Sequence, residues 1–276
     1  MLKDLLLSGD TVVAPGAYDA LSALIASQSG FKAIYLSGFG VAGSLLGKPD
    51  IGLVTAPEMI ERVKQVVEAA GSTPVIADGD NGYGDEQQVA LLVNAYEKAG
   101  AQCIQLEDQV SPKRCGHMDN KEVVDLDEAA AKIAMAVRSR NSENFMIMAR
   151  TDSRATHDLN EALRRGKAFL NAGADILFIE APTSIEELQT IKQEFPETVL
   201  VANMVEEGKT PELNVSNLAD LGYQLILHPI TALLAAAKTL QNSYASIKSQ
   251  DNEKLATAER LTFQEYNQLV GLDKYK

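Results

Sequence analysis

Residues 74–108 read PVIADGDNGYGDEQQVALLVNAYEKAGAQCIQLED and contain one repeat of a pattern that runs through the chain. The stretch begins with an apolar, β-type run at 74–79 and ends with a second such run at 103–108. Between them, 85–101 has the spacing of an amphipathic helix and is closed by Gly100, a residue that favours helix C-termini. Two strands that are apolar on both faces and joined by a helix predict a parallel β-α-β unit.

The same alternation extends in both directions. Apolar runs with strand-like composition lie at 11–17, 33–38, 74–79, 103–108, 146–151, 176–181, 200–204 and 225–229. Eight β/α units in a chain of 276 residues predict an α/β fold, a single (β/α)8 barrel of the TIM type. We expect one barrel domain over 1–276, in which 231–276 forms a C-terminal helical segment with one helix more than the barrel needs.

Composition excludes several classes of protein. With 46% hydrophobic residues the chain can bury one large core, and its net charge of −13 argues against a nucleic-acid partner. No apolar run approaches the roughly 20 residues of a membrane span, and the N-terminal stretch is too short and too charged for a secretory signal. Two cysteines form no disulfide framework. These features predict a cytoplasmic protein without a membrane partner.

Polar residues cluster where the predicted strands end. In a barrel these ends lie on the face that carries the active site. In any soluble chain, one or two charged residues would lie at strand ends by chance. Acids at the ends of three strands, together with an arginine at the end of a fourth, are harder to explain by chance. The polar residues at these positions are Ser37, Gly38, Asp78, Asp80, Glu107, Asp108, Arg150, Asp152, Glu180 and Asn203.

Three of these acids, Asp78, Asp80 and Glu107, favour a metal site. Carboxylates without a matching set of Cys or His suit a hard cation that keeps several waters, which is Mg²⁺, with Mn²⁺ possible. Taken alone, the stretch 78–84 is equally typical of an ordinary Gly/Asn/Asp turn. Glu107 on the next strand favours the metal.

Two other motifs carry less weight. GFGVAG at 38–43 satisfies the dinucleotide-binding fingerprint, but that fingerprint needs a helix. Gly47, Pro49 and Gly52 follow at once, so we expect no helix there. A zinc site through Cys115 and His117 lacks the remaining ligands.

Two connections, 39–56 and 109–125, are long for α/β loops and are candidate lids. The second contains SPKRCGHMD at 111–119, where Cys115 is flanked by Lys113, Arg114 and His117. Positive surroundings lower a thiol pKa, as reactive cysteines require. The alternative is a bystander thiol in a basic surface loop.

Six motifs together resemble the isocitrate lyase and phosphoenolpyruvate mutase superfamily, and the likeness runs from about residue 10 to 270. Within that superfamily it is nearest to the short lyases that cleave 2-methylisocitrate or 2,3-dimethylmalate. The motifs are KRCGH at 113–117, DGDNGYG at 78–84, QLEDQ at 105–109, YLSGFG at 35–40, LLGKPD at 45–50 and NMVEEGKTP at 203–211.

The resemblance assigns roles to individual residues. It implies that Cys115 is the catalytic acid and that Asp78, Asp80 and Glu107 hold Mg²⁺, partly through waters. It also implies a homotetramer in which a C-terminal helix is exchanged between subunits. Further expected substrate-binding residues are Ser37, Gly38, Phe39, Lys113, Arg114, Gly116, Arg150, Glu180, Asn203 and Pro229, with His117 and Arg150 in catalysis and Tyr35 or Asp50 as the initial base.

The implied reaction is carbon–carbon cleavage of a small 2-hydroxy di- or tricarboxylate into a 2-oxo acid and a carboxylate. Related lyases for methylisocitrate usually carry a basic residue where this chain has Met118. That difference favours an alkyl-substituted dicarboxylate, with methylisocitrate still open. Oxaloacetate decarboxylase or phosphonomutase activity is an alternative, and a non-catalytic small-molecule sensor is the alternative outside enzymes.

Overall fold

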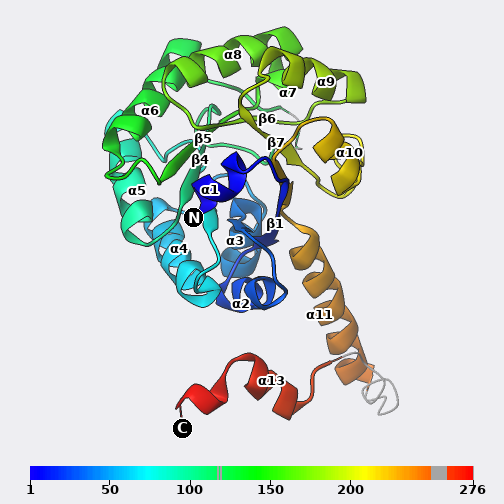
Figure 1. Cartoon of the computed structure of the whole chain (residues 1–276). Coiled ribbons are helices and arrows are strands. Elements are labelled where there is room, and N and C mark those ends of the chain that lie inside the picture. Colours follow the sequence, from blue (N-terminus) through cyan, green and yellow to red (C-terminus); the bar gives the residue numbers. More distant parts are fainter. Residues whose placement is uncertain (117, 119, 250–259, 276) are drawn as a thin grey trace. The chain divides into compact units, whose positions relative to one another are not determined.

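The computed structural model describes residues 1–116, 118, 120–249 and 260–275. Its centre is a closed barrel of eight parallel strands that pair in chain order, with β8 returning to β1 (Figure 1). Each predicted run coincides with one strand, with β7 beginning one residue before its run, so the predicted TIM-type barrel is confirmed. The strands are β1 (Val12–Ala17), β2 (Ile34–Leu36), β3 (Val75–Asp78), β4 (Cys103–Glu107), β5 (Met146–Thr151), β6 (Ile176–Ile179), β7 (Val199–Asn203) and β8 (Leu225–His228).

Helices follow the strands and surround the barrel, except α1, which precedes β1 (Figure 1). Helix α5 shows why they form where they do: Asp85 caps its first turn by accepting from the backbone N–H groups of Gln87 and Gln88, and Gly100 follows its end with φ 92°. The helices up to β8 are α1 (Leu2–Leu7), α2 (Ala20–Gln28), α3 (Gly38–Val41), α4 (Ala56–Ala70), α5 (Glu86–Lys98), α6 (Leu126–Ser139), α7 (Ser153–Thr156), α8 (Leu159–Asn171), α9 (Ile185–Glu194) and α10 (Val215–Asp220).

The core has two layers. The larger one lies between the strands and the surrounding helices, and the smaller one fills the barrel itself with residues such as Ile76, Met148 and Phe178. Leu2 and Leu6 of α1 belong to the inner layer and are fully buried, so the N-terminal helix packs against the barrel interior. The active-site face is therefore the opposite end, where the strands terminate.

The two long connections differ from each other. In 109–125 the described residues form no helix, and a single bridge joins Gln109 to Val123. In the first, we expected no helix at the GFGVAG motif (38–43), and that prediction is wrong. Ser37 caps α3, and a π-helical turn, η1 (Ala42–Leu46), continues it until Gly47 adopts a left-handed conformation. Gly47 ends this short helix, and Pro49 and Gly52 follow it, so these three residues limit its length but do not prevent it.

The chain divides into two compact units, Met1–Thr231 and Ala232–Lys276. Beyond β8 the structure has α11 (Thr231–Ser249), α13 (Phe263–Leu269) and a 3₁₀ turn, η2 (Leu272–Tyr275). The C-terminal segment predicted as helical, 231–276, is not helical throughout. Residues 252–259 lie outside the described part, 260–262 are not helical, and Thr262 caps α13. No residue of α11 or α13 is buried. None of the described helices has the length and apolarity to cross a membrane.

Candidate active site

A cavity of about 240 Å³ opens at the carboxyl ends of the strands. Almost every predicted site residue lines it, including Gly116 and Pro229 from different loops. Gly38 and Asp80 lie directly behind the wall, next to Asp78, and His117 lies outside the described residues. The lining is Tyr35, Ser37, Phe39, Asp50, Asp78, Glu107, Lys113, Arg114, Cys115, Gly116, Met118, Arg150, Glu180, Asn203, Val205, Pro229 and Ile230.

One side of the cavity is acidic and is built around Asp78. Its Oδ1 accepts hydrogen bonds from the backbone N–H of Asp80 at 3.0 Å and from Gln105 Nε2 at 3.1 Å. Its Oδ2 accepts from the Gly38 N–H at 3.1 Å. A Cβ at Gly38 would lie 2.8 Å from Asp78 Oδ2, so this close approach requires glycine.

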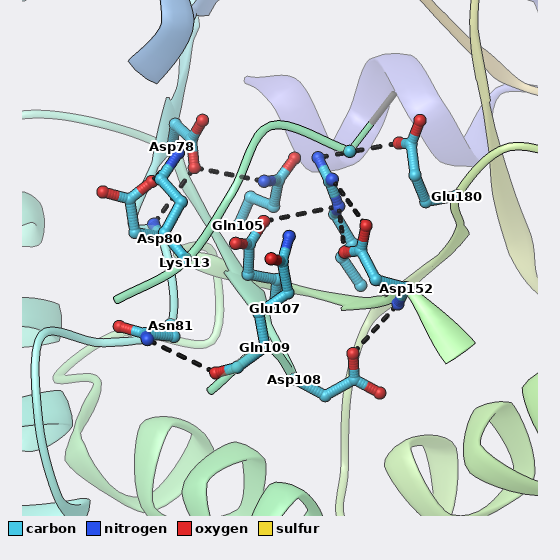
Figure 2. Close-up of polar contacts among 12 residues, drawn as sticks. Asp78, Asp80, Asn81, Gln105, Glu107, Asp108, Gln109, Lys113, Asp152 and Glu180 are labelled. Atoms are coloured by element: carbon cyan, nitrogen blue, oxygen red, sulfur yellow. Dashed lines mark hydrogen bonds and ion pairs between the residues drawn. The ribbon is translucent and has the colours of Figure 1, made fainter. Parts of the chain in front are cut away.

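Lys113 reaches into this acidic side from the 109–125 loop, as Figure 2 shows next to Asp78 and Asp80. Its Nζ lies 2.5 Å from Asp50 Oδ1 and 2.7 Å from Asp80 Oδ1. Burial opposes the charge, yet the neighbouring carboxylates hold the pKa of Lys113 well above its usual value. The sequence suggested that Lys113 provides positive surroundings for Cys115, but its charge is engaged by these acids.

The other side is organised by Arg150. Its Nε and Nη2 donate to the two oxygens of Asp152 at 2.9 and 3.1 Å, and its Nη1 lies 3.6 Å from Glu180 Oε2. The guanidinium also stacks over the Phe178 ring, 5.1 Å from its centroid. Glu107 Oε2 lies 3.4 Å from the Nε, so three carboxylates and an aromatic face fix the orientation of a guanidinium that the sequence assigned to substrate binding.

Asp108 supports this arrangement from behind. Its Oδ1 accepts from the backbone N–H of Asp152 at 2.9 Å. Its Oδ2 accepts from Thr151 Oγ1 at 2.6 Å and from Arg165 Nη1 at 3.0 Å (Figure 2 shows Asp108 beside Asp152). The sequence placed Asp108 and Asp152 at strand ends but gave neither a role, and it gave no sign of Arg165.

Buried charge in the described residues is strongly unbalanced. Seven acids are buried against four cations: Asp50, Asp78, Asp80, Glu107, Asp108, Asp152 and Glu180 against Lys113, Lys121, Arg150 and Arg165. Burial and Asp80 raise the pKa of Asp78 to about 6, and burial raises that of Glu107 well above its usual value. Such carboxylates must either take up protons or gain a cation.

The residues fit a hydrated divalent cation. Glu107 Oε1 is buried and has no hydrogen-bond partner among the described residues, and Glu107 lines the same cavity as Asp78. Among the described residues no three Asp, Glu, His or Cys side chains are arranged to hold an ion directly. A cation that keeps part of its water shell, as Mg²⁺ does, suits carboxylates at this spacing.

The two candidate bases differ in their suitability. Tyr35 Oη donates to Gln105 Oε1 at 2.9 Å, and burial raises the pKa of Tyr35 well above its usual value, so the phenol keeps its proton. Burial also raises the pKa of Asp50, although Lys113 partly offsets it. A carboxylate with a raised pKa is the better proton acceptor at neutral pH.

The segment Cys115–Gly116 lies across the cavity. The Cys115 N–H donates to the Asp50 carbonyl at 3.1 Å, and a Cβ at Gly116 would lie only 2.2 Å from Arg150 Nη2. Cys115 is partly exposed, whereas Cys103 is buried inside the barrel, where burial raises its thiol pKa well above the usual value. The two thiols therefore differ greatly in access to solvent.

The family model for phosphoenolpyruvate phosphomutase matches residues 2–248. The chain belongs to this family. The predicted membership of the phosphoenolpyruvate mutase and isocitrate lyase superfamily is thereby confirmed, over nearly the whole described barrel.

Two relatives of this chain are named as lyases. It is 46% identical over 275 residues to 2,3-dimethylmalate lyase of Eubacterium barkeri, covering 100% of this chain and 94% of the relative. It is 37% identical over 276 residues to 2-methylisocitrate lyase of Aeropyrum pernix, covering 100% of this chain and 88% of the relative. A crystal structure of a 2,3-dimethylmalate lyase superposes with a TM-score of 0.94 at 36% identity, covering 99% of this chain and 91% of that one.

Proposed function

We propose that this chain is a magnesium-dependent carbon–carbon lyase that cleaves a 2-hydroxy dicarboxylate with alkyl substituents into a 2-oxo acid and a carboxylate. The observation that carries the proposal is one cavity that combines an acidic cation site, the fixed Arg150 guanidinium and the Cys115 thiol. The names of the relatives at 46% and 37% identity support the reaction class.

The cation would be held by Asp78, Asp80 and Glu107, partly through waters. When bound, it polarises the hydroxyl and carboxylate oxygens of the substrate as a Lewis acid. Its charge would also offset the excess of buried acids, which lowers the electrostatic cost of an anionic substrate in this cavity.

Residues of the chain would move the protons. Asp50, the better base of the two candidates, takes the proton of the substrate hydroxyl. The bond between the hydroxyl carbon and its neighbour then breaks, giving a 2-oxo acid and a carbanion that delocalises into the adjacent carboxylate. Cys115 gives its proton to that carbanion and completes the carboxylate product. Arg150 binds a substrate carboxylate, and Tyr35 stays a hydrogen-bond donor.

The cavity favours an alkyl-substituted dicarboxylate over a tricarboxylate. Phe39, Met118, Val205 and Ile230 give it an apolar part that suits alkyl groups. A third carboxylate would need a further cation, yet the Lys113 ammonium is already paired with two acids. Among the described lining residues this leaves Arg114 for such a charge.

The proposal includes a homotetramer in which a C-terminal helix is exchanged between subunits. The exposed surface of the C-terminal unit supports it. Its described helices, α11 and α13, bury no residue, and large apolar side chains such as Leu240, Tyr244 and Phe263 are exposed. Apolar surface of this kind is typical of interfaces between protein chains.

The test is a coupled assay for released 2-oxo acid with magnesium, run on alkylmalates, methylisocitrate, isocitrate and oxaloacetate. We expect the highest kcat/KM with an alkylmalate such as 2,3-dimethylmalate. Preference for methylisocitrate would keep the lyase but reject the substrate class. Pyruvate from oxaloacetate alone would favour decarboxylation, and no turnover of any compound would favour a sensor.

A further inference from the structure

Lys121 lies near the end of the 109–125 loop, outside the cavity lining, yet its side chain is only 1% exposed. Its ammonium donates to two acceptors. One is Asp152 Oδ1, at 2.6 Å, and the other is the backbone carbonyl of Gly116. A buried lysine with these two partners connects the barrel to the loop segment that carries Cys115.

Asp152 is the residue through which this connection acts. Its side chain is fully buried, and the same carboxylate that accepts from Lys121 also binds the Nε and Nη2 of Arg150. Burial alone would raise its pKa, but Arg150 and Lys121 hold the pKa of Asp152 below its usual value. Asp152 is therefore a fixed anion between the substrate-binding guanidinium and the loop.

Gly116 packs against Arg150, the guanidinium that Asp152 binds. A Cβ on Gly116 would lie 2.2 Å from Arg150 Nη2 and 2.9 Å from Glu180 Cγ. The backbone of the loop therefore packs directly on the side chains of Arg150 and Glu180. The Gly116 carbonyl that accepts from Lys121 thus belongs to the part of the loop that covers the cavity.

We propose that Lys121 is a positioning residue that holds the Cys115–Gly116 segment closed over the cavity by joining the Gly116 carbonyl to Asp152. Closure keeps the Cys115 thiol at the reacting carbon and excludes water from the carbanion. The inference rests on the proposed function only for its effect on turnover, since closure itself can be measured without substrate.

The test compares Lys121→Met with the wild type and with Lys132→Met, a control that removes a lysine whose side chain is 13% exposed. Lys132 lies on α6 and pairs with Glu128 at 3.3 Å. The full-length protein is treated with iodoacetamide without substrate, and modification of each cysteine is followed by peptide mass spectrometry. Buried Cys103 reports on general loosening.

We expect Lys121→Met to speed alkylation of Cys115 by roughly 10- to 100-fold, the factor expected when a charge-assisted hydrogen bond is lost. Cys103 should stay unmodified, and Lys132→Met should match the wild type. Turnover should fall by a similar factor in Lys121→Met only. If Lys121→Met does not fold, Lys121→Gln, which keeps a donor without the charge, replaces it.

An unchanged rate for Cys115 in a folded variant would overturn the proposal. So would equal acceleration at Cys103, because that result would mean a general loss of structure. If no tested compound is turned over by the wild type, the proposed function fails, while the alkylation rates still decide the role of Lys121.

Discussion

Gly116→Ala tests whether the loop and Arg150 form one closed site. The new Cβ would lie 2.2 Å from Arg150 Nη2 and 2.9 Å from Glu180 Cγ, whereas ordinary van der Waals contact begins near 3.4 Å. Either the guanidinium or the loop must therefore move by about 1 Å. Arg150 is held by both oxygens of Asp152, so neither movement leaves the arrangement intact.

A displacement of about 1 Å at a reacting group costs roughly 100-fold in rate, which is about 2.7 kcal/mol of transition-state stabilisation. We expect that loss in kcat/KM for the alkylmalate, measured by release of 2-oxo acid with magnesium. Folding should be retained, because the residue lies in a loop, and the thermal midpoint checks this.

The control is Gly84→Ala, the same substitution where the new Cβ meets only the flexible, exposed side chain of Gln88. It should keep its activity. If Gly116→Ala turned over within about threefold of the wild type, the close packing of loop and guanidinium would not belong to the reacting state, and the reasoning would fail.

Three further predictions concern the thiols, the acidic side and the C-terminal unit. Cys115→Ser should lower turnover by roughly two to four orders of magnitude with little change in substrate affinity, while Cys103→Ser should cost only packing; near wild-type turnover would move the acid elsewhere. With EDTA present, the contribution of Asp78 to stability should be fully present below about pH 4 and be lost as the pH rises to about 6, by at most about 3 kcal/mol, because burial and Asp80 raise the pKa of Asp78 from 3.8 to about 6. Magnesium should therefore raise the thermal midpoint more at pH 7 than at pH 5, Asp80→Ala should need more metal, and equal shifts at both pH values would contradict the site. A chain shortened to residues 1–250 should dissociate or aggregate in light scattering, and a well-behaved tetramer of it would exclude the exchanged helix.

The barrel could be predicted because its signal is local and repeated. Each strand is a short apolar run, each helix has its own spacing and caps, and eight repetitions leave few alternatives. The error at 38–46 shows the limit of this reasoning. Three helix breakers follow Ser37 closely, but a cap and nine residues are enough for a short helix before Gly47 ends it.

Most of the site could also be predicted, since the end of each strand places its polar residue on one face of the barrel. One polar residue that this rule misses is Gln105. It lies inside β4, accepts from Tyr35 and donates to Asp78, and so joins a candidate base to the cation site. A polar side chain in the middle of an apolar strand was its one signal.

Lys121 and Asp152 had no comparable signal, because their significance depends on how the 109–125 loop folds back. In sequence, Lys121 is one more charge in a polar loop, and Asp152 is one more acid after a strand. Only the folded chain shows that the lysine is buried, and that its partner already holds Arg150. A buried ion pair is costly unless every charge in it is satisfied, and here the third partner is a carbonyl of the loop itself. The loop therefore supplies both the Lys121 ammonium that neutralises Asp152 and the Gly116 carbonyl that accepts a second hydrogen bond from that ammonium. Opening the loop would leave the Asp152 carboxylate with Arg150 alone.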